Sequence, residues 1–246
     1  MQLIIALVIA ICLFPTMTLA AIAELTGQRA TATQCLNSDS CAVAYPGNVT
    51  SGDLLVVGGN TYDTGGTTGY TVTDTVGTSY TVFNCTALTG NPNATPFIAV
   101  GVAAATGANT VTVNPTLDAS ANEIIFGIGE FSGTATAGIL DVDGGSSTGS
   151  STTPSDGLTT ITANSVILGL VGFQTSSTVT PGGSYTEISE SQGSLNGFNF
   201  VNRMATTAQA YTVDWTLGTT QAWSACTVSI KPLSSARRRM APLVFQ

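Results

Sequence analysis

The sequence predicts an all-β protein: a two-sheet antiparallel sandwich of the jelly-roll kind, built from two related halves and preceded by an N-terminal signal helix. Three observations predict this class. Beyond the first 23 residues, apolar residues at helical spacing are scarce. Short runs of β-branched and aromatic residues recur instead, separated by clusters of Gly, Asn, Asp and Thr. These runs also return in the same order in the second half of the chain.

The runs are of two kinds, which predict strands in different surroundings. Residues 53–58 (DLLVVG) and 165–173 (SVILGLVGF) are continuously apolar, as in strands that are buried on both faces. Residues 69–74, 79–83 and 110–113 alternate apolar with polar side chains, as in strands that turn one face toward solvent.

Four landmarks of the first half have counterparts in the second half, in the same order. The pairs are 53–58 with 165–169, 79–82 with 184–187, 97–111 with 198–213, and 123–126 with 222–226. The expected halves are residues 45–143 and 155–232, and the Gly- and Ser-rich residues 144–154 are expected to form a surface loop or linker. Because one half cannot easily bury both faces of its sheet, we expect two sheets packed face to face over a shared interior. Two small sandwiches in tandem are the alternative.

The N-terminus carries the pattern of a secretory signal peptide, which we assign to residues 1–23. An apolar run, residues 3–14, ends at a proline, and two small-residue cleavage sites follow, Thr18-Leu19-Ala20 and Ala21-Ile22-Ala23. The run is shorter than the ~20 residues that a membrane-spanning helix needs. We therefore expect a secreted protein, extracellular or at the cell surface, with no membrane contact beyond the signal segment. An uncleaved anchor and a buried N-terminal helix are the alternatives.

The cysteines agree with export. Removal of the signal peptide takes Cys12 away and leaves four cysteines, an even number that predicts disulfides in an exported chain. Four cysteines allow three pairings. Cys35 and Cys41 flank a short polar loop, so we favour a Cys35–Cys41 bond. The second bond, Cys85–Cys226, would then join the two halves, which favours a single sandwich domain.

The expected division of the chain has four parts: a signal peptide, residues 1–23; an N-terminal extension with the Cys35/Cys41 loop, residues 24–44; the sandwich domain, residues 45–232; and a basic tail, residues 233–246. The tail holds Arg237, Arg238 and Arg239. We expect it to be a solvated end of the chain, and a weak contact with an anionic polymer or membrane is the alternative.

Composition excludes several functions. Only 8% of residues are charged and the formal net charge is −8, so Thr, Ser, Gly and Asn must cover most of the surface. Such a neutral exterior suits an extracellular protein, or one that packs against copies of itself.

With six basic residues in all, the chain is expected not to bind nucleic acid, because Lys and Arg contacts with phosphate dominate that affinity. The chain has no histidine, which removes Ser-His-Asp and Cys-His catalysis and most zinc sites.

Two carboxylate patterns are candidate sites of chemistry. Asp141 and Asp143 stand two residues apart before glycines, a spacing that can give two oxygens to Ca²⁺, and a solvated turn is the alternative. No other cofactor is expected. Glu123 and Glu130 could serve as the carboxylate pair of a jelly-roll polysaccharide hydrolase or lyase. Because tryptophans are few, structural carboxylates are the favoured interpretation and no catalytic residue is assigned.

Aromatic side chains near predicted loops are the candidates for ligand binding. Tyr62, Tyr70 and Trp215 could stack on sugar rings if their faces are exposed together, with Asn and Asp binding the hydroxyls. Tyr80 and Tyr185 hold equivalent places in the two halves, which favours a structural role for both.

The order of several short motifs resembles a group of uncharacterised secreted or phage-associated β-sandwich proteins of environmental bacteria. The motifs are residues 52–57 (GDLLVV), 72–81 (VTDTVGTSYT), 104–113 (AATGANTVTV), 130–133 (EFSG), 139–141 (ILD), Trp223 and 229–232 (SIKP). The resemblance spans residues 45 to 232. It implies a sandwich fold and export, and it carries over no catalytic residue.

The sequence thus leads to one main expectation and two alternatives. The main one is a non-enzymatic extracellular structural or adhesive β-sandwich of a cell-surface or virion-surface assembly, with copies of itself or other surface proteins as partners. The first alternative is a carbohydrate-binding module for a polysaccharide, with or without Ca²⁺. The second is the hydrolase or lyase described above.

Overall fold

The chain folds as an all-β protein, and the predicted class is confirmed. The computed structural model describes residues 21–31, 34–88, 93–117, 122–174 and 177–234. Within these ranges the one helical element is a short 3-10 turn, η1 (Thr26–Gln28), and no helix there has the length and apolar character needed to cross a bilayer. The expected signal helix and the three tail arginines lie outside the described residues.

The first half contains a large and a small antiparallel sheet. The large sheet has the order β10 (Asn122–Ser132), β5 (Leu54–Asp63), β8 (Asn93–Val102), β7 (Tyr80–Asn84). Three short strands pair in succession along the outer edge of β10, namely β1 (Ala23–Glu24), β2 (Ala30–Thr31) and β3 (Cys35–Leu36). The small sheet has the order β4 (Cys41–Val49), β9 (Gly107–Leu117), β6 (Thr67–Asp74).

The second half also contains a large and a small antiparallel sheet. The large sheet has the order β11 (Leu140–Ser151), β18 (Gln221–Ile230), β13 (Ser165–Phe173), β16 (Gly197–Ala205), β15 (Thr186–Gln192). The small sheet has the order β12 (Ser155–Thr159), β17 (Ala210–Leu217), β14 (Val179–Pro181). Taken in chain order, strands β4 to β10 of the first half pair with one another in the same pattern as strands β12 to β18 of the second half. Beside β18, β11 takes the position that β1, β2 and β3 take beside β10.

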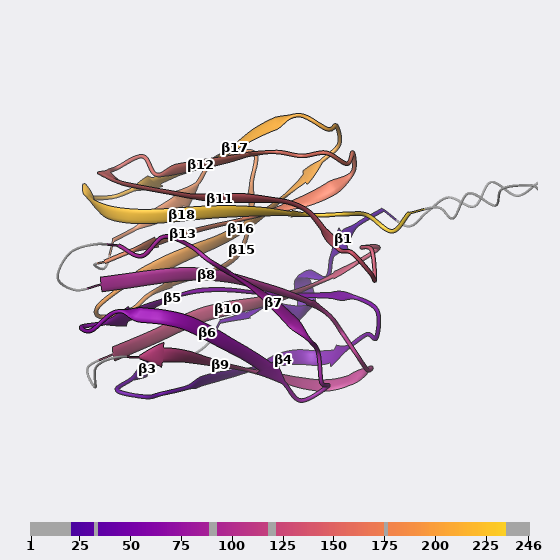
Figure 1. The fold of residues 1–246 in the computed structure, drawn as a ribbon, viewed down its shortest axis with the longest axis horizontal. Coiled ribbons are helices and arrows are strands. Elements are labelled where there is room, and N and C mark those ends of the chain that lie inside the picture. Colours follow the sequence, from indigo (N-terminus) through magenta and orange to yellow (C-terminus); the bar gives the residue numbers. More distant parts are fainter. Residues whose placement is uncertain (1–20, 32–33, 89–92, 118–121, 175–176, 235–246) are drawn as a thin grey trace, which may run out of the picture.

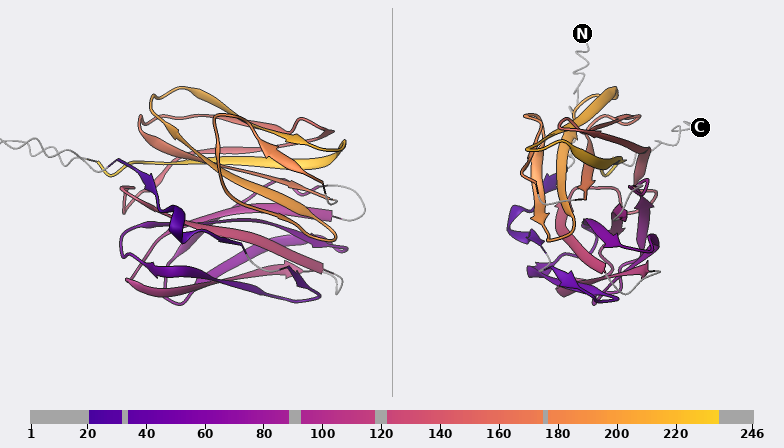
Figure 2. Two further views of the ribbon diagram at one scale, coloured as in Figure 1. Left: turned by 180° about the vertical axis from the view of Figure 1, so that it is seen from behind. Right: turned by 90° about the vertical axis from the view of Figure 1, so that its left-hand side faces the viewer.

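Over the described residues, the four sheets stack as four layers, with the two large sheets in the middle (Figures 1 and 2). Three apolar interiors fill the spaces between the layers. One lies inside the first half and includes Val57 and Phe97. One lies inside the second half and includes Val213. The third, which we call the central interior, lies between the large sheets and includes Phe131 and Phe200.

The number of sheets differs from the expected two-sheet sandwich with one shared interior. β5 and β13 are buried at every position, as their continuous apolar runs predict. Along β5, Leu54 and Val56 face the central interior, whereas Leu55 and Val57 face the interior of the first half. One strand therefore serves two interiors, because successive side chains point to opposite faces of a sheet.

The large sheets approach each other closely. A Cβ atom added at Gly58 of β5 would lie 2.6 Å from the ring of Phe200 on β16, so a larger side chain would clash at this position. Asn60 extends the contact: its Nδ2 donates to the carbonyl oxygen of Gly197 at 2.9 Å, across the central interior. Buried polar groups need such partners, and this one ties the two halves together.

Two segments that were expected to contribute no strands to the sandwich contain strands. The Gly- and Ser-rich residues 144–154, expected as a loop or linker, belong largely to β11, which pairs with β18 along its length. Here tertiary pairing overrides the low strand propensity of Gly and Ser. A Cβ at Gly149 would lie 2.6 Å from the ring of Trp223, so the glycine allows the close packing of β11 on that ring. The expected extension, residues 24–44, supplies β1, β2 and β3 and the start of β4 to the sheets of the first half.

Candidate functional site

A row of hollows follows the line where β7 of the first half faces β11 of the second. At one end, a hollow of about 550 Å³ lies between Ser79 and Thr81 on one side and Ile139 and Leu140 on the other, with Lys231 at its rim. Lys231 is the one Lys in the sequence, so this end combines a cation with hydroxyl groups.

Two further hollows continue the same line. One of about 320 Å³ is lined by Asn84, Asp143 and Ser146. The next, also about 320 Å³, is lined by Thr86 and Thr148 among others, with Trp223 at its base. We call the three hollows together the seam groove. Its walls carry hydroxyl, amide and backbone groups, which are the partners that a neutral polar polymer would need.

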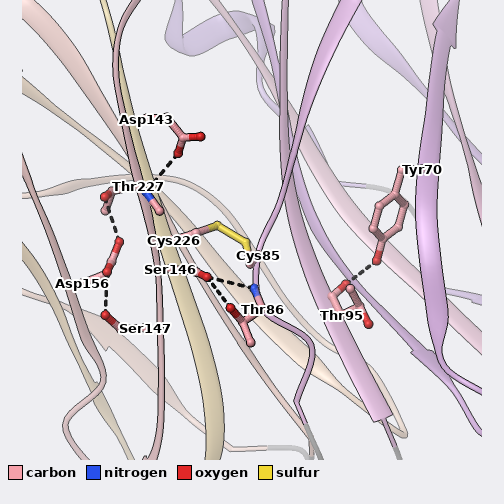
Figure 3. Close-up of a disulfide and its surroundings, with 11 residues drawn as sticks. Tyr70, Cys85, Thr86, Thr95, Asp143, Ser146, Ser147, Asp156, Cys226 and Thr227 are labelled. Atoms are coloured by element: carbon pink, nitrogen blue, oxygen red, sulfur yellow. Dashed lines mark hydrogen bonds between the residues drawn. A yellow bond between two sulfur atoms is a disulfide. The ribbon is translucent and has the colours of Figure 1, made fainter.

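A disulfide crosses the seam groove. Cys85 follows β7 and Cys226 lies on β18, so the bond joins the two halves covalently, as predicted (Figure 3). Beside it, the backbone N–H of Thr86 donates to Ser146 Oγ at 3.0 Å, and the two side-chain hydroxyls lie 2.6 Å apart (Figure 3).

The other predicted bond, Cys35–Cys41, is also present and links β3 to β4. Both favoured pairings are confirmed.

A buried carboxylate supports β11 on its inner side. Asp156 of β12 accepts hydrogen bonds from Ser147 Oγ at 2.7 Å and from Thr227 Oγ1 at 2.8 Å (Figure 3). Burial raises the pKa of Asp156 above its ordinary range, although both hydroxyls oppose the shift. Among the described hollows, none is lined by Asp156. The carboxylate connects three strands, β11, β12 and β18.

On the opposite side of the molecule, a second carboxylate fastens the halves to each other. Glu123 of β10 is fully buried. Its carboxylate accepts backbone N–H groups of Ser194, Leu195 and Asn196 at 2.7 to 2.8 Å, and the Ser194 hydroxyl at 3.2 Å. These donors come from the turn between β15 and β16, in the other half. We call this arrangement the Glu123 latch. Charge-assisted hydrogen bonds of this kind are among the stronger ones in proteins.

Glu130, the other candidate carboxylate for hydrolysis, lies in a different environment. It is fully buried, and its Oε1 accepts the backbone N–H of Thr50 at 2.8 Å. Burial raises the pKa of Glu130, and the neighbouring Asp53 raises it further. Glu123 and Glu130 are seven residues apart on one strand, which places them roughly 23 Å apart at ~3.3 Å per residue. Glycosidase carboxylates lie within about 10 Å of each other, so these two cannot act as a pair.

The three aromatic residues expected to bind sugars do not form an exposed platform. Trp215 is 2% exposed, and its Nε1 donates to Asn199 Oδ1 at 3.0 Å. Tyr62 is 8% exposed. Tyr70 stacks on Phe97 with ring centroids 4.1 Å apart, and its hydroxyl donates to a backbone carbonyl (Figure 3). Trp215 also lies in the other half of the chain. The rings of Tyr70 and Trp215 pack in the apolar interiors of the first and second halves, on the face of each strand that points inward.

The two aspartates proposed for calcium bind separate backbone segments. Asp141 Oδ2 accepts the N–H groups of Ile161 and Thr162 at 2.9 and 3.2 Å. Burial opposes ionisation of Asp141, but these hydrogen bonds outweigh it and lower its pKa. Asp143 Oδ1 accepts the N–H of Gly145 at 3.0 Å and lines the seam groove. In the part of the chain that the structure describes, no three His, Cys, Asp or Glu residues form a group that could hold a metal ion.

Sequence reasoning missed the seam groove and the Glu123 latch, because both depend on which strands become neighbours. Comparison with protein-family models, with curated proteins and with solved structures gives no match to this chain. The resemblance to secreted and phage-associated sandwich proteins therefore stays a prediction.

Proposed function

We propose that this chain is a non-enzymatic structural or adhesive module on the outside of a cell or virion, with copies of itself or other surface proteins as partners. The observation that carries the proposal is the fastening of the two halves along both sides. The Cys85–Cys226 bond links them on one side, and the Glu123 latch links them on the other. The apolar central interior lies between these links. A body joined in this way resists separation of its layers, as a surface component must.

Export is part of the proposal. Two disulfides and a neutral exterior are compatible with an oxidising, extracellular setting. The signal-like pattern of residues 1–23 supports the same location. The absence of histidine from the sequence and the separation of Glu123 from Glu130 on β10 favour a role without catalysis.

We further propose that the two halves are repeats of one jelly-roll-like unit. The order of strand pairing supports this, since β4 to β10 and β12 to β18 pair in the same way. The edge strand of each unit precedes it in the chain: β1, β2 and β3 for the first unit and β11 for the second. The repeats would then begin earlier than residues 45 and 155.

Immunogold labelling of the source cells, and of virions that they release, tests the location and the role. The label is expected on the outer surface, and purified protein is expected to release no reducing ends from polysaccharides. A label confined to the cytoplasm would contradict the proposal. So would a polysaccharide-cleaving activity that Glu130→Gln abolishes. Size-exclusion chromatography and electron microscopy of the same protein show whether copies assemble.

A second function, binding of a polysaccharide, is favoured by the seam groove. The groove is open and runs along two edge strands, and hydroxyl groups alternate with apolar side chains along its walls, with Lys231 at one end. A carbohydrate would be held by hydrogen bonds from these walls, with little stacking on aromatic rings. Asp143 in the middle hollow is the residue through which Ca²⁺ would assist.

A glycan array distinguishes the two functions. For a carbohydrate-binding module, Thr81→Arg is expected to abolish binding, because the longer side chain fills the first hollow. Thr73→Arg, an exposed change on the small sheet of the first half, is the matched control and is expected to leave binding unchanged. Repeating the array with a chelator tests the role of Ca²⁺. No binding to any glycan would reject this second function and leave the structural one.

A further inference from the structure

We propose that signal peptidase cuts this chain between Ala20 and Ala21, so that the mature protein begins at Ala21. The sequence offers two sites with small residues at the required positions, one ending at Ala20 and one ending at Ala23. The inference rests on the proposed export, and it names the site at which the exported chain is modified.

The residues between the two sites are part of the fold. Ile22 is 5% exposed and belongs to the central interior. Ala23 pairs with Ser132 at the end of β10, and the next residue, Glu24, pairs with Phe131. The Glu24 carboxylate in turn binds Arg29 and accepts Asn202 Nδ2 of the second half at 2.7 Å. A cut after Ala23 would remove the buried isoleucine and half of β1.

The second half has an isoleucine at the corresponding position. Ile139 immediately precedes β11, whose first residue Leu140 pairs with Ile230 at the end of β18. Ile22 immediately precedes β1, whose first residue pairs at the end of β10. Both isoleucines pack against the central interior. In the second half the chain is continuous, so its isoleucine stays in place. In the first half the same contact survives only if the cut lies before Ile22.

The chain passes from an exposed residue, Ala21, to a buried one, Ile22, immediately after the proposed site. Ala21 is exposed and lines an open hollow of about 460 Å³ together with Met204 and Leu233. A new α-amino group is charged at neutral pH, and it must keep its water or find a partner. Ala21 meets this need, because it lies at the surface just before the chain enters the sheet.

N-terminal sequencing of the exported protein tests the proposal, with two matched variants. The wild-type protein is expected to begin at Ala21. Ala23→Tyr alters an exposed side chain and is expected to give the same N-terminus in the same yield. Ala20→Tyr is expected to lose this product, because signal peptidase requires a small residue before the cut. A wild-type protein that begins at Glu24, or a block of processing by Ala23→Tyr, would overturn the inference.

A stability measurement gives a second, independent readout. The forms 21–246 and 24–246 can each be exported behind a leader whose own cleavage site is fixed. The shorter form is expected to melt roughly 4–10 °C lower, because it lacks a buried isoleucine and a strand pairing. Equal melting temperatures would contradict the proposed role of Ile22. A full-length chain that stays in the cytoplasm would instead refute the proposed export, whereas an exported chain cut after Ala23 refutes only this inference.

Discussion

At the scale of single residues, polar side chains at the boundary between the halves form hydrogen bonds with partners from the other half. Asn60, Glu24 and Glu123 each form hydrogen bonds across the boundary between the large sheets. The fully buried carboxylate of Glu123 accepts four hydrogen bonds there. The loss of one such group should therefore be measurable as a change in stability.

Glu123→Gln is expected to lower the free energy of unfolding by about 2–3 kcal/mol, because one carboxylate oxygen is replaced by an amide NH₂ that faces backbone N–H donors. Urea unfolding monitored by tryptophan fluorescence measures the change. Glu190→Gln, at an exposed carboxylate of β15, is the control and is expected to change stability by less than about 0.5 kcal/mol. An equal effect of the two substitutions would contradict the latch.

Glu130→Gln is expected to change how stability depends on pH. Burial, aided by Asp53, raises the pKa of Glu130 above 4.5, so the folded protein holds this proton to a higher pH than the unfolded chain does. Wild-type stability should therefore fall, relative to the variant, as the pH rises from about 4 to about 7. Urea unfolding of both proteins across this range measures the difference.

Asp141→Asn is a comparison for Glu130→Gln, because the pKa of Asp141 is shifted in the opposite direction. Hydrogen bonds from Thr162 and Ile161 outweigh burial and lower the pKa of Asp141 below 3.8, so its contribution is present above that pH and is lost as the pH falls further. Between pH 4 and 7, roughly, the advantage of wild type over this variant should change little. If the difference in the free energy of unfolding between wild type and Glu130→Gln is constant from about pH 4 to about pH 7, the pKa of Glu130 is the same in the folded and unfolded chains, which would contradict the prediction.

At the scale of elements, the continuous apolar runs identified the central strands, and both disulfides followed from the positions of the cysteines. The burial of Trp215 could also have been predicted from the sequence. In residues 210–217 (AYTVDWTL), Trp215 shares its parity with Tyr211 and Val213, which marks it as inward-facing. β11 could not be predicted, because its Gly and Ser residues form a strand only where β18 pairs with them and Trp223 requires a glycine.

The two disulfides should differ in their contribution to stability. In the chain-entropy model, the Cys85–Cys226 bond, with a sequence separation of 141, contributes about 5 kcal/mol. The same model gives about 2 kcal/mol for the Cys35–Cys41 bond, whose separation is 6. Paired Cys→Ala variants, compared by thermal unfolding, should follow this order. A larger loss from removal of the shorter loop would indicate that strain or residual structure in the unfolded chain dominates.

At the scale of the whole molecule, the all-β class followed from the sequence, but the stacking of four layers did not. A doubly buried strand such as β5 shows that both of its faces are covered, and it does not show by which sheet. The seam groove and the Glu123 latch arise from this stacking. For the same reason, the residues that fasten the halves could not be found from spacing alone.

The central claim is that this chain works outside the reducing cytoplasm as one body whose halves are covalently joined. Mass spectrometry of protein recovered from its native location, after alkylation of free thiols without reduction, tests this most directly. We predict no alkylation at Cys35, Cys41, Cys85 or Cys226, together with a peptide pair linked through Cys85 and Cys226. Four alkylated cysteines in the native protein would contradict the claim.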